Sequence, residues 1–135
     1  MCPKPRPGVT NLHFIAHTHL NIGWKRTFRG NYARKYISIS CLAKNIMETV
    51  SAELLKKKNR MFTVTEMAFF KKWFEENNEV FKIIVRKYID EGRLELAGGG
   101  WVTSDEASTL YSDLVDQMTL GQRWINDTFG PCALP

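Results

Sequence analysis

The 135-residue sequence has few cysteines and no long hydrophobic run. The three cysteines, Cys2, Cys41 and Cys132, do not stand at the spacing of metal ligands, and their odd number leaves at least one unpaired within the chain. We expect Cys41 to be a buried helical thiol, whereas Cys2 and Cys132 could pair with each other or with other chains. No apolar run approaches the roughly 20 residues needed to cross a bilayer, so no membrane span is expected.

The beginning of the chain also lacks an apolar segment. Residues 1–11 are polar and rich in proline, so we expect an N-terminal coil and no signal peptide in this chain. Acidic residues are fewer than basic ones, 14 against 19, which gives a net charge of +5. The one dense basic cluster, residues 56–60, is typical of a helix C-terminus. Because no aromatic side chains are interleaved with it, we expect no nucleic-acid partner.

Hydrophobic residues make up 44% of the sequence, and their spacing alternates between short runs and three- to four-residue steps. The runs predict strands at 12–16, 61–66 and 94–97. The steps predict helical stretches at 32–57, 69–74, 80–91 and 107–127. Three successive βα units indicate an α/β fold with a parallel sheet or barrel. Since a barrel of this kind needs about eight strands, we interpret residues 12–135 as part of a larger barrel domain.

Glycines and short polar motifs divide these elements. Gly92 is expected to end the helix over 80–91 as a left-handed cap. The run Gly98–Gly100 predicts a loop in which the backbone closely approaches another group. Thr103 and Glu106 have the spacing of a capping box, which predicts the start of the last helix. Asp105 and Glu106 would then be acids of its first turn, or would face a cleft at the strand ends.

Chemically useful residues follow each predicted strand, where ligands bind in α/β proteins. They are His17, His19, Asn21 and Trp24 after the first strand, Glu66 after the second, and Trp101, Asp105 and Glu106 after the third. Alternate residues of an extended segment point to one side, so His17 and His19 share a side. A His-x-His pair at a strand end suits Zn²⁺, although it supplies only half of a site.

Each of these residues also has a purely structural interpretation. His17 and His19 could be hydrogen-bonded core residues. Trp24 and Trp101 could belong to the core, or could stack against the apolar face of a sugar. Glu66 could orient an imidazole N–H, or could cap the following helix.

Several motifs occur together and in order. The first is His17-Thr18-His19-Leu20-Asn21-Ile22-Gly23-Trp24, which is similar to the pattern H-[TS]-H-x-D-x-G-W. The others are Glu66–Trp73, Glu91–Glu95, Gly99–Val102, Asp105–Ala107 and Asp116–Gly121. In this combination the sequence resembles the N-terminal part of the class II α-mannosidases, glycoside hydrolase family 38, and is most similar to the lysosomal type.

The resemblance implies three successive βα units of a parallel seven-stranded α/β barrel, here truncated. It implies a retaining, zinc-dependent glycosidase acting on α-mannosidic bonds of N-glycans. His19 and Asn21 stand at zinc-ligand positions of the family pattern, and Trp24 stands where a tryptophan lines the mannose pocket. The family's nucleophile and acid/base fall outside this sequence, so no catalytic residue is expected in it. A lysosomal or secretory location is implied, and the sequon Asn126-Asp127-Thr128 is compatible with it.

The sequence departs from the family pattern at Asn21, where the family has aspartate. Asparagine keeps the shape but removes the charge, which weakens zinc binding. We therefore expect an α-mannosidase by family whose isolated 135-residue chain is inactive. Its expected partners are a mannose-containing oligosaccharide and the missing C-terminal part of the barrel. One alternative is a non-catalytic remnant that binds carbohydrate or a partner protein, and another is a metal-dependent deacetylase on a similar barrel.

Overall fold

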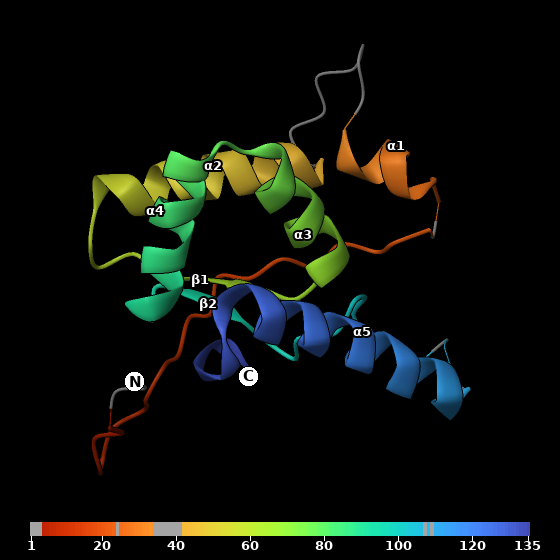
Figure 1. Ribbon diagram of the computed structural model, residues 1–135. Helices are drawn as coiled ribbons and strands as arrows, with labels where there is room; N and C mark the ends of the chain where they lie inside the picture. Colours follow the sequence, from red (N-terminus) through yellow and green to blue (C-terminus); the bar gives the residue numbers. More distant parts are fainter. Residues whose placement is uncertain (1–3, 24, 34–41, 107, 109) are drawn as a thin grey trace.

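The computed structural model describes residues 4–23, 25–33, 42–106, 108 and 110–135 and has a mixed α/β fold. Figure 1 shows helices packed around two short strands, with the N-terminal residues running away from the body of the molecule. In chain order the elements are α1 (Phe28–Tyr32), α2 (Ala43–Lys56), β1 (Phe62–Val64), α3 (Met67–Glu76), α4 (Glu79–Asp90), β2 (Leu94–Leu96), α5 (Tyr111–Phe129) and the 3-10 helix η1 (Pro131–Ala133).

β1 and β2 are parallel neighbours, as the sequence predicts. Phe62 pairs with Leu94 and Val64 pairs with Leu96, while α3 and α4 form the connection between the strands. The side chains alternate, because Leu94 and Leu96 are buried and Glu95 between them is exposed. One face of this sheet therefore contributes to the core.

A third stretch of chain runs parallel to β1 for a short distance. His17 forms a bridge with Thr63, whose backbone N–H donates to the Ala16 carbonyl at 2.9 Å. The Thr63 carbonyl accepts the Thr18 N–H at 3.0 Å. We call residues 16–23 the His17 segment; it lies beside β1 on the side away from β2.

The prediction of a buried strand over Leu12–Ala16 is wrong. Leu12, Phe14 and Ile15 are 75%, 93% and 71% exposed, and pairing with β1 begins only where this stretch ends. A parallel strand becomes buried when neighbouring strands and helices cover both of its faces. The described residues supply no such cover here, and they form a two-stranded sheet with one added bridge rather than a barrel.

The predicted helices are confirmed in kind and shifted at their ends. The prediction over 32–57 corresponds to α2, and residues 34–41 lie outside the described part. The helix expected over 80–91 is α4, whose N-cap Asn78 accepts the Phe81 N–H at 2.9 Å. Gly92 follows it with φ +65°, which is the left-handed cap expected there.

The predicted start of the last helix is wrong. α5 begins at Tyr111, and its N-cap residue Leu110 makes no side-chain cap bond. The capping box does not form because α5 begins eight residues after Thr103, whose hydroxyl donates to Glu66. Glu106 consequently lies in the exposed loop before the helix, as does Asp105.

α3 carries the centre of the hydrophobic core. Phe69 and Phe70 are completely buried, and burying a side chain of this size contributes roughly 1.5–3 kcal/mol. Edge-to-face contacts join α3 to α5: the Trp124 ring centroid lies 5.9 Å from that of Phe70 and 6.3 Å from that of Phe74. The sheet and helices α2 to α5 thereby share one core cluster.

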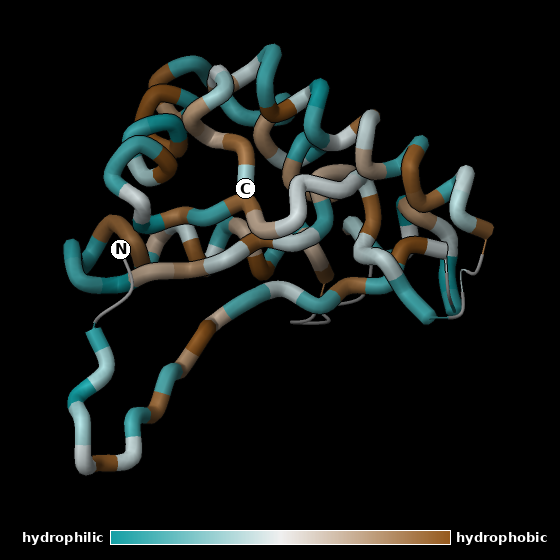
Figure 2. The backbone as a smooth tube through the Cα atoms, turned by 90° about the horizontal axis from the view of Figure 1, so that it is seen from below, coloured by the Kyte–Doolittle hydropathy of each residue, from teal (hydrophilic) through white to brown (hydrophobic). Residues whose placement is uncertain are grey.

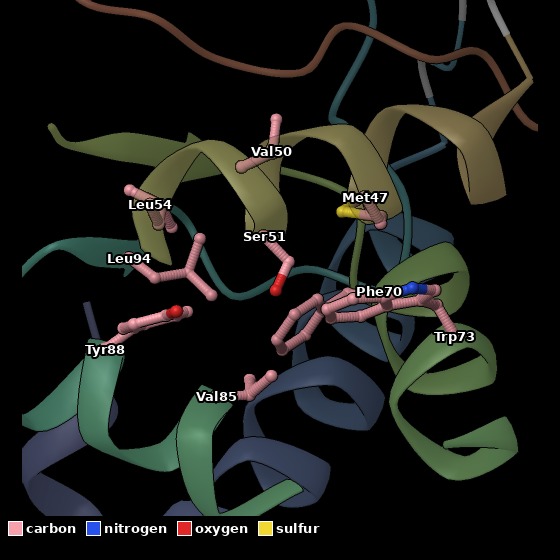
Figure 3. A pocket seen from close by; sticks show the side chains of 9 residues that line it. All are labelled: Met47, Val50, Ser51, Leu54, Phe70, Trp73, Val85, Tyr88 and Leu94. Carbon is pink, nitrogen blue, oxygen red and sulfur yellow. The ribbon is translucent and has the colours of Figure 1, made fainter. Parts of the chain in front are cut away.

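A small hollow remains between α2, α3, α4 and β2. Figure 3 shows the nine side chains around it, among them Met47, Phe70 and Tyr88. Its volume of about 10 Å³ has room for about one water molecule. We therefore regard it as a packing gap rather than a ligand site. None of the described helices is both long enough and apolar enough to cross a membrane.

The glycine loop after β2 closely approaches another group, as predicted, and that group is α5. A methyl group added at Gly121 would lie 2.1 Å from the Gly99 carbonyl oxygen. The loop also completes the N-terminus of α3, since the Gly100 and Trp101 carbonyls accept the first two helical N–H groups at 3.1 and 3.0 Å. This contact brings the end of β2 next to the end of β1.

Candidate functional site

The His17 segment presents alternate side chains to opposite sides. Thr18 is only 3% exposed, whereas His17 and His19 are both exposed. This alternation is what an extended segment predicts. His17 Nδ1 lies 2.6 Å from the Thr18 carbonyl oxygen, which it can reach as a donor in the Nδ1–H tautomer.

His19 and Asn21 line a shared hollow beside the strand ends. Its volume is about 280 Å³, and Lys25, Arg26 and Asn31 complete much of its polar wall. Asn31 donates from its side-chain amide to the Asn21 carbonyl at 2.9 Å, which joins the segment to α1. Trp24, the third residue expected at this site, lies outside the described residues.

The two donors in this hollow do not by themselves make a zinc site. The His19 imidazole is a common type of zinc ligand, but the Asn21 amide oxygen brings no charge to balance the ion. In the part of the chain that the structure describes, no three His, Cys, Asp or Glu side chains are grouped closely enough to hold a metal. The two basic side chains in the wall, Lys25 and Arg26, add further positive charge.

Glu66 lies under the strand ends and binds the His17 segment. Its side chain is completely buried, and Oε1 accepts the Leu20 backbone N–H at 2.7 Å. Oε1 also accepts the Thr103 hydroxyl at 3.1 Å. Glu66 is the N-cap residue of α3, as one interpretation from the sequence expected, but its side chain makes no cap bond. The other interpretation is wrong, because no imidazole is among its described hydrogen-bond partners. The reason is the backbone N–H of Leu20, which takes the place expected for an imidazole.

Two threonines continue the pairing beyond the end of β1. The Thr65 N–H donates to Thr18 Oγ1 at 3.0 Å, and the two hydroxyl oxygens lie 3.2 Å apart. The Thr65 hydroxyl also lies 2.8 Å from Glu66 Oε1 and 3.0 Å from the Thr18 carbonyl oxygen. Its single hydrogen serves one of these acceptors at a time. A hydrogen-bonded chain therefore runs from the His17 segment to the buried carboxylate.

The structure does not bring the residues expected after β2 together at one site. Trp101 is half-buried and lines a separate hollow of about 310 Å³ with Phe28 and Lys72. Asp105 and Glu106 are exposed and do not line the hollow that His19 shares. Thr103 was not expected at the site. A polar residue near the end of a strand is the only sequence signal for it.

A second polar group fixes α1, which follows the His17 segment. The Tyr32 hydroxyl donates to Glu76 Oε2 on α3 at 2.5 Å, and Lys72 lies 2.8 Å from the other carboxylate oxygen. Burial of Tyr32, followed by its bond to Glu76, raises the pKa of the phenol. The hydrogen bond from Lys72, followed by that from Tyr32, lowers the pKa of Glu76.

Comparison with known proteins agrees with the motifs of the His17 segment. Residues 9–134 match the family described as Glycosyl hydrolases family 38 N-terminal domain. The lysosomal alpha-mannosidases of Mus musculus and Homo sapiens are 41% and 40% identical over 135 residues, which are 99% of this chain and 13% of each relative. An alpha-mannosidase of Arabidopsis thaliana is 38% identical over 130 residues, 94% of this chain and 13% of that protein. The chain thus spans a small part of the relatives' length, and it belongs to glycoside hydrolase family 38, whose N-terminal domain it matches.

Proposed function

We propose that this chain forms part of the catalytic domain of a retaining α-mannosidase that acts on mannose-containing oligosaccharides. One observation carries the proposal: the family motif lies at the carboxyl ends of parallel neighbours, where His19 and Asn21 share a hollow. Residues 12–135 would belong to that domain and residues 1–11 to a preceding coil. The names of the relatives further support a lysosomal or secretory location.

In this proposal the chain contributes to sugar binding and other segments supply the bond-breaking groups. Retaining glycosidases need two carboxylates about 5 Å apart at the scissile bond. Glu66 is completely buried, and Asp105 and Glu106 are exposed outside the hollow, so none of the three fits such a pair. His19 and Asn21 can donate or accept hydrogen bonds with sugar hydroxyls, and Trp24 would offer an apolar stacking surface. In a family-type zinc site, His19 and Asn21 would be two neutral ligands that depend on charged ligands from elsewhere.

Hydrolysis of an aryl α-mannoside tests this division of roles. We expect the purified chain to release no aryl alcohol, because none of these three carboxylates at the described strand ends fits the catalytic pair. In the same preparation, NMR titration with methyl α-mannoside should shift the signals of His19 and Asn21. Hydrolysis by the chain alone would show that its carboxylates are wrongly assigned. A titration that leaves both residues unmoved would contradict sugar binding.

A non-catalytic remnant is the second candidate function, and the neutral donor pair favours it. Zinc titration of a longer product that retains Asn21 separates the two candidates. Tight binding supports the enzyme, whereas the absence of binding supports the remnant.

Glycosylation of Asn126 tests the proposed location. This residue is exposed, and its sequon lies in the last turn of α5. If the chain passes through the secretory pathway, glycosidase treatment should reduce its mass by one N-glycan, and Thr128→Ala should abolish that change.

A further inference from the structure

One buried carboxylate oxygen joins three stretches that are distant in the sequence. Glu66 Oε1 receives the Leu20 N–H from the His17 segment, 46 residues earlier. It receives the Thr103 hydroxyl from the loop after β2, 37 residues later. The hydroxyl of the adjacent Thr65 lies 2.8 Å away. The ends of all three parallel neighbours are thus held by a single atom.

A carboxylate suits this arrangement better than an amide, because both of its oxygens are acceptors. An ionised carboxylate oxygen can accept several hydrogen bonds, and its bonds are about twice as strong as those to a neutral acceptor. An amide carbonyl in its place offers two lone pairs to the same donors, and the amide NH₂ would take the place of Oε2. Oε2 is buried and has no hydrogen-bond partner among the described residues, so that NH₂ would be left without an acceptor.

Stability does not explain why a carboxylate is present here. Burying a carboxylate costs free energy, and an oxygen without a donor increases that cost. Glu66 instead holds Leu20, the residue that lies between His19 and Asn21 in the chain.

We propose that Glu66 is a positioning residue for His19 and Asn21, the two side chains through which the His17 segment lines the hollow. By binding the Leu20 N–H it fixes the backbone on both sides and sets where His19 and Asn21 enter the hollow. Glu66 has no exposed surface, so it acts through Leu20 and does not contact a ligand. The proposal rests on the proposed function only for the identity of that ligand; the positioning itself is independent of it.

Amide hydrogen exchange in the 135-residue chain tests the positioning directly. In Glu66→Gln the Leu20 amide should exchange about tenfold faster or more, because a hydrogen bond to a charged group is lost or weakened. The amides of Phe62 and Ala97, which bond within the sheet, should be unchanged. Glu95→Gln is the matched control: it removes the same charge from an exposed side chain of β2, and Leu20 should exchange as in the wild type.

A second variant covers the case in which Glu66→Gln does not fold. Glu66→Asp keeps the charge but withdraws the carboxylate from Leu20 by one methylene group. It should show the same local increase at Leu20. Unchanged exchange at Leu20 in a folded variant would overturn the proposal. So would equal increases at Leu20, Phe62 and Ala97, since these would indicate a general loss of structure.

Titration with methyl α-mannoside then links the positioning to the hollow. Glu66→Gln should bind the sugar at least about tenfold more weakly than Glu95→Gln, although the Phe62 and Ala97 amides exchange at the wild-type rate in both variants. If the two variants bind the sugar with equal affinity although the Leu20 amide exchanges faster in Glu66→Gln, Glu66 does not position His19 and Asn21 for the sugar. If neither the wild type nor any variant binds the sugar, the proposed function fails, and the exchange at Leu20 still decides whether Glu66 positions the segment.

Discussion

The two parallel neighbours of β1 are held in different ways. β2 lies on one side, and its Leu94 and Leu96 are each only 4% exposed. The His17 segment lies on the other side, preceded by Phe14, which is 93% exposed. The same kind of strand pairing is therefore secured by apolar packing on one side and by polar bonds on the other. Figure 2 shows the N-terminal stretch leaving the packed elements as an isolated tube that includes hydrophobic residues.

Removing one aromatic ring from the packed core and one from the stretch before the His17 segment should give the largest difference in the free energy of unfolding. Phe70→Ala should lower the free energy of unfolding by about 3–5 kcal/mol, because a completely buried ring leaves a cavity. Phe14→Ala should change it by less than about 0.5 kcal/mol. Urea unfolding followed by tryptophan fluorescence measures both values. Similar losses in the two variants would show that residues 12–16 are packed in solution.

The contact between the glycine loop and α5 provides the next test. Gly121→Ala should destabilise the chain by about 1–3 kcal/mol, because its methyl group meets the Gly99 carbonyl oxygen, which belongs to the backbone. This cost should exceed the roughly 1 kcal/mol that alanine gains over glycine in a helix. The control is Ser112→Ala at an exposed position of the same helix, with an expected change below about 0.5 kcal/mol. A stabilised Gly121→Ala would mean that the loop lies further from α5.

The sequence was a good guide where local chemistry decides the outcome. Gly92 was identified as a helix cap because a positive φ favours glycine whatever surrounds it. The close approach at Gly98–Gly100 was also identified, but its partner was not. That partner, Gly121, lies on a helix more than twenty residues further on, and its lack of a side chain becomes informative only when the two are seen together.

Burial and polar pairing were harder to predict, since both depend on other segments. Phe14 belongs to an apolar run that is typical of a buried strand, but no described element covers it. Thr103 has the spacing of a capping box, but α5 begins only at Tyr111, and the Thr103 hydroxyl donates to Glu66. Glu66 itself was singled out correctly as a residue at a strand end. Its partner was missed because a backbone N–H, such as that of Leu20, has no signature in a sequence.

Replacing Asn21 by aspartate restores the residue of the family pattern in the His17 segment. Asn21→Asp adds an anionic ligand beside His19, and zinc affinity should rise about tenfold or more because the charge of the ion is better balanced. Competition with a chromophoric chelator measures the affinity, and Asn59→Asp, at an exposed position outside the hollow, is the control for added charge alone. Equal affinities for the two variants would indicate that residue 21 does not face the ion.

The smallest expected effect concerns the polar contact that holds α1 against the core. The pKa of Glu76 is lowered, so its ionised form stabilises the fold at pH values above the pKa of the unfolded chain, and this contribution is lost as pH falls through the folded-state pKa. The Tyr32 phenol is neutral throughout that range, in accord with its raised pKa, so it adds no pH dependence of its own there. The free energy of unfolding should therefore decline less between pH 7 and pH 3 in Glu76→Gln than in the wild type, whereas the surface variant Glu79→Gln should follow the wild type more closely. Parallel pH profiles for the wild type and Glu76→Gln would show that α1 is held by the packing of Phe28 and Tyr32 against Phe69, and not by the carboxylate.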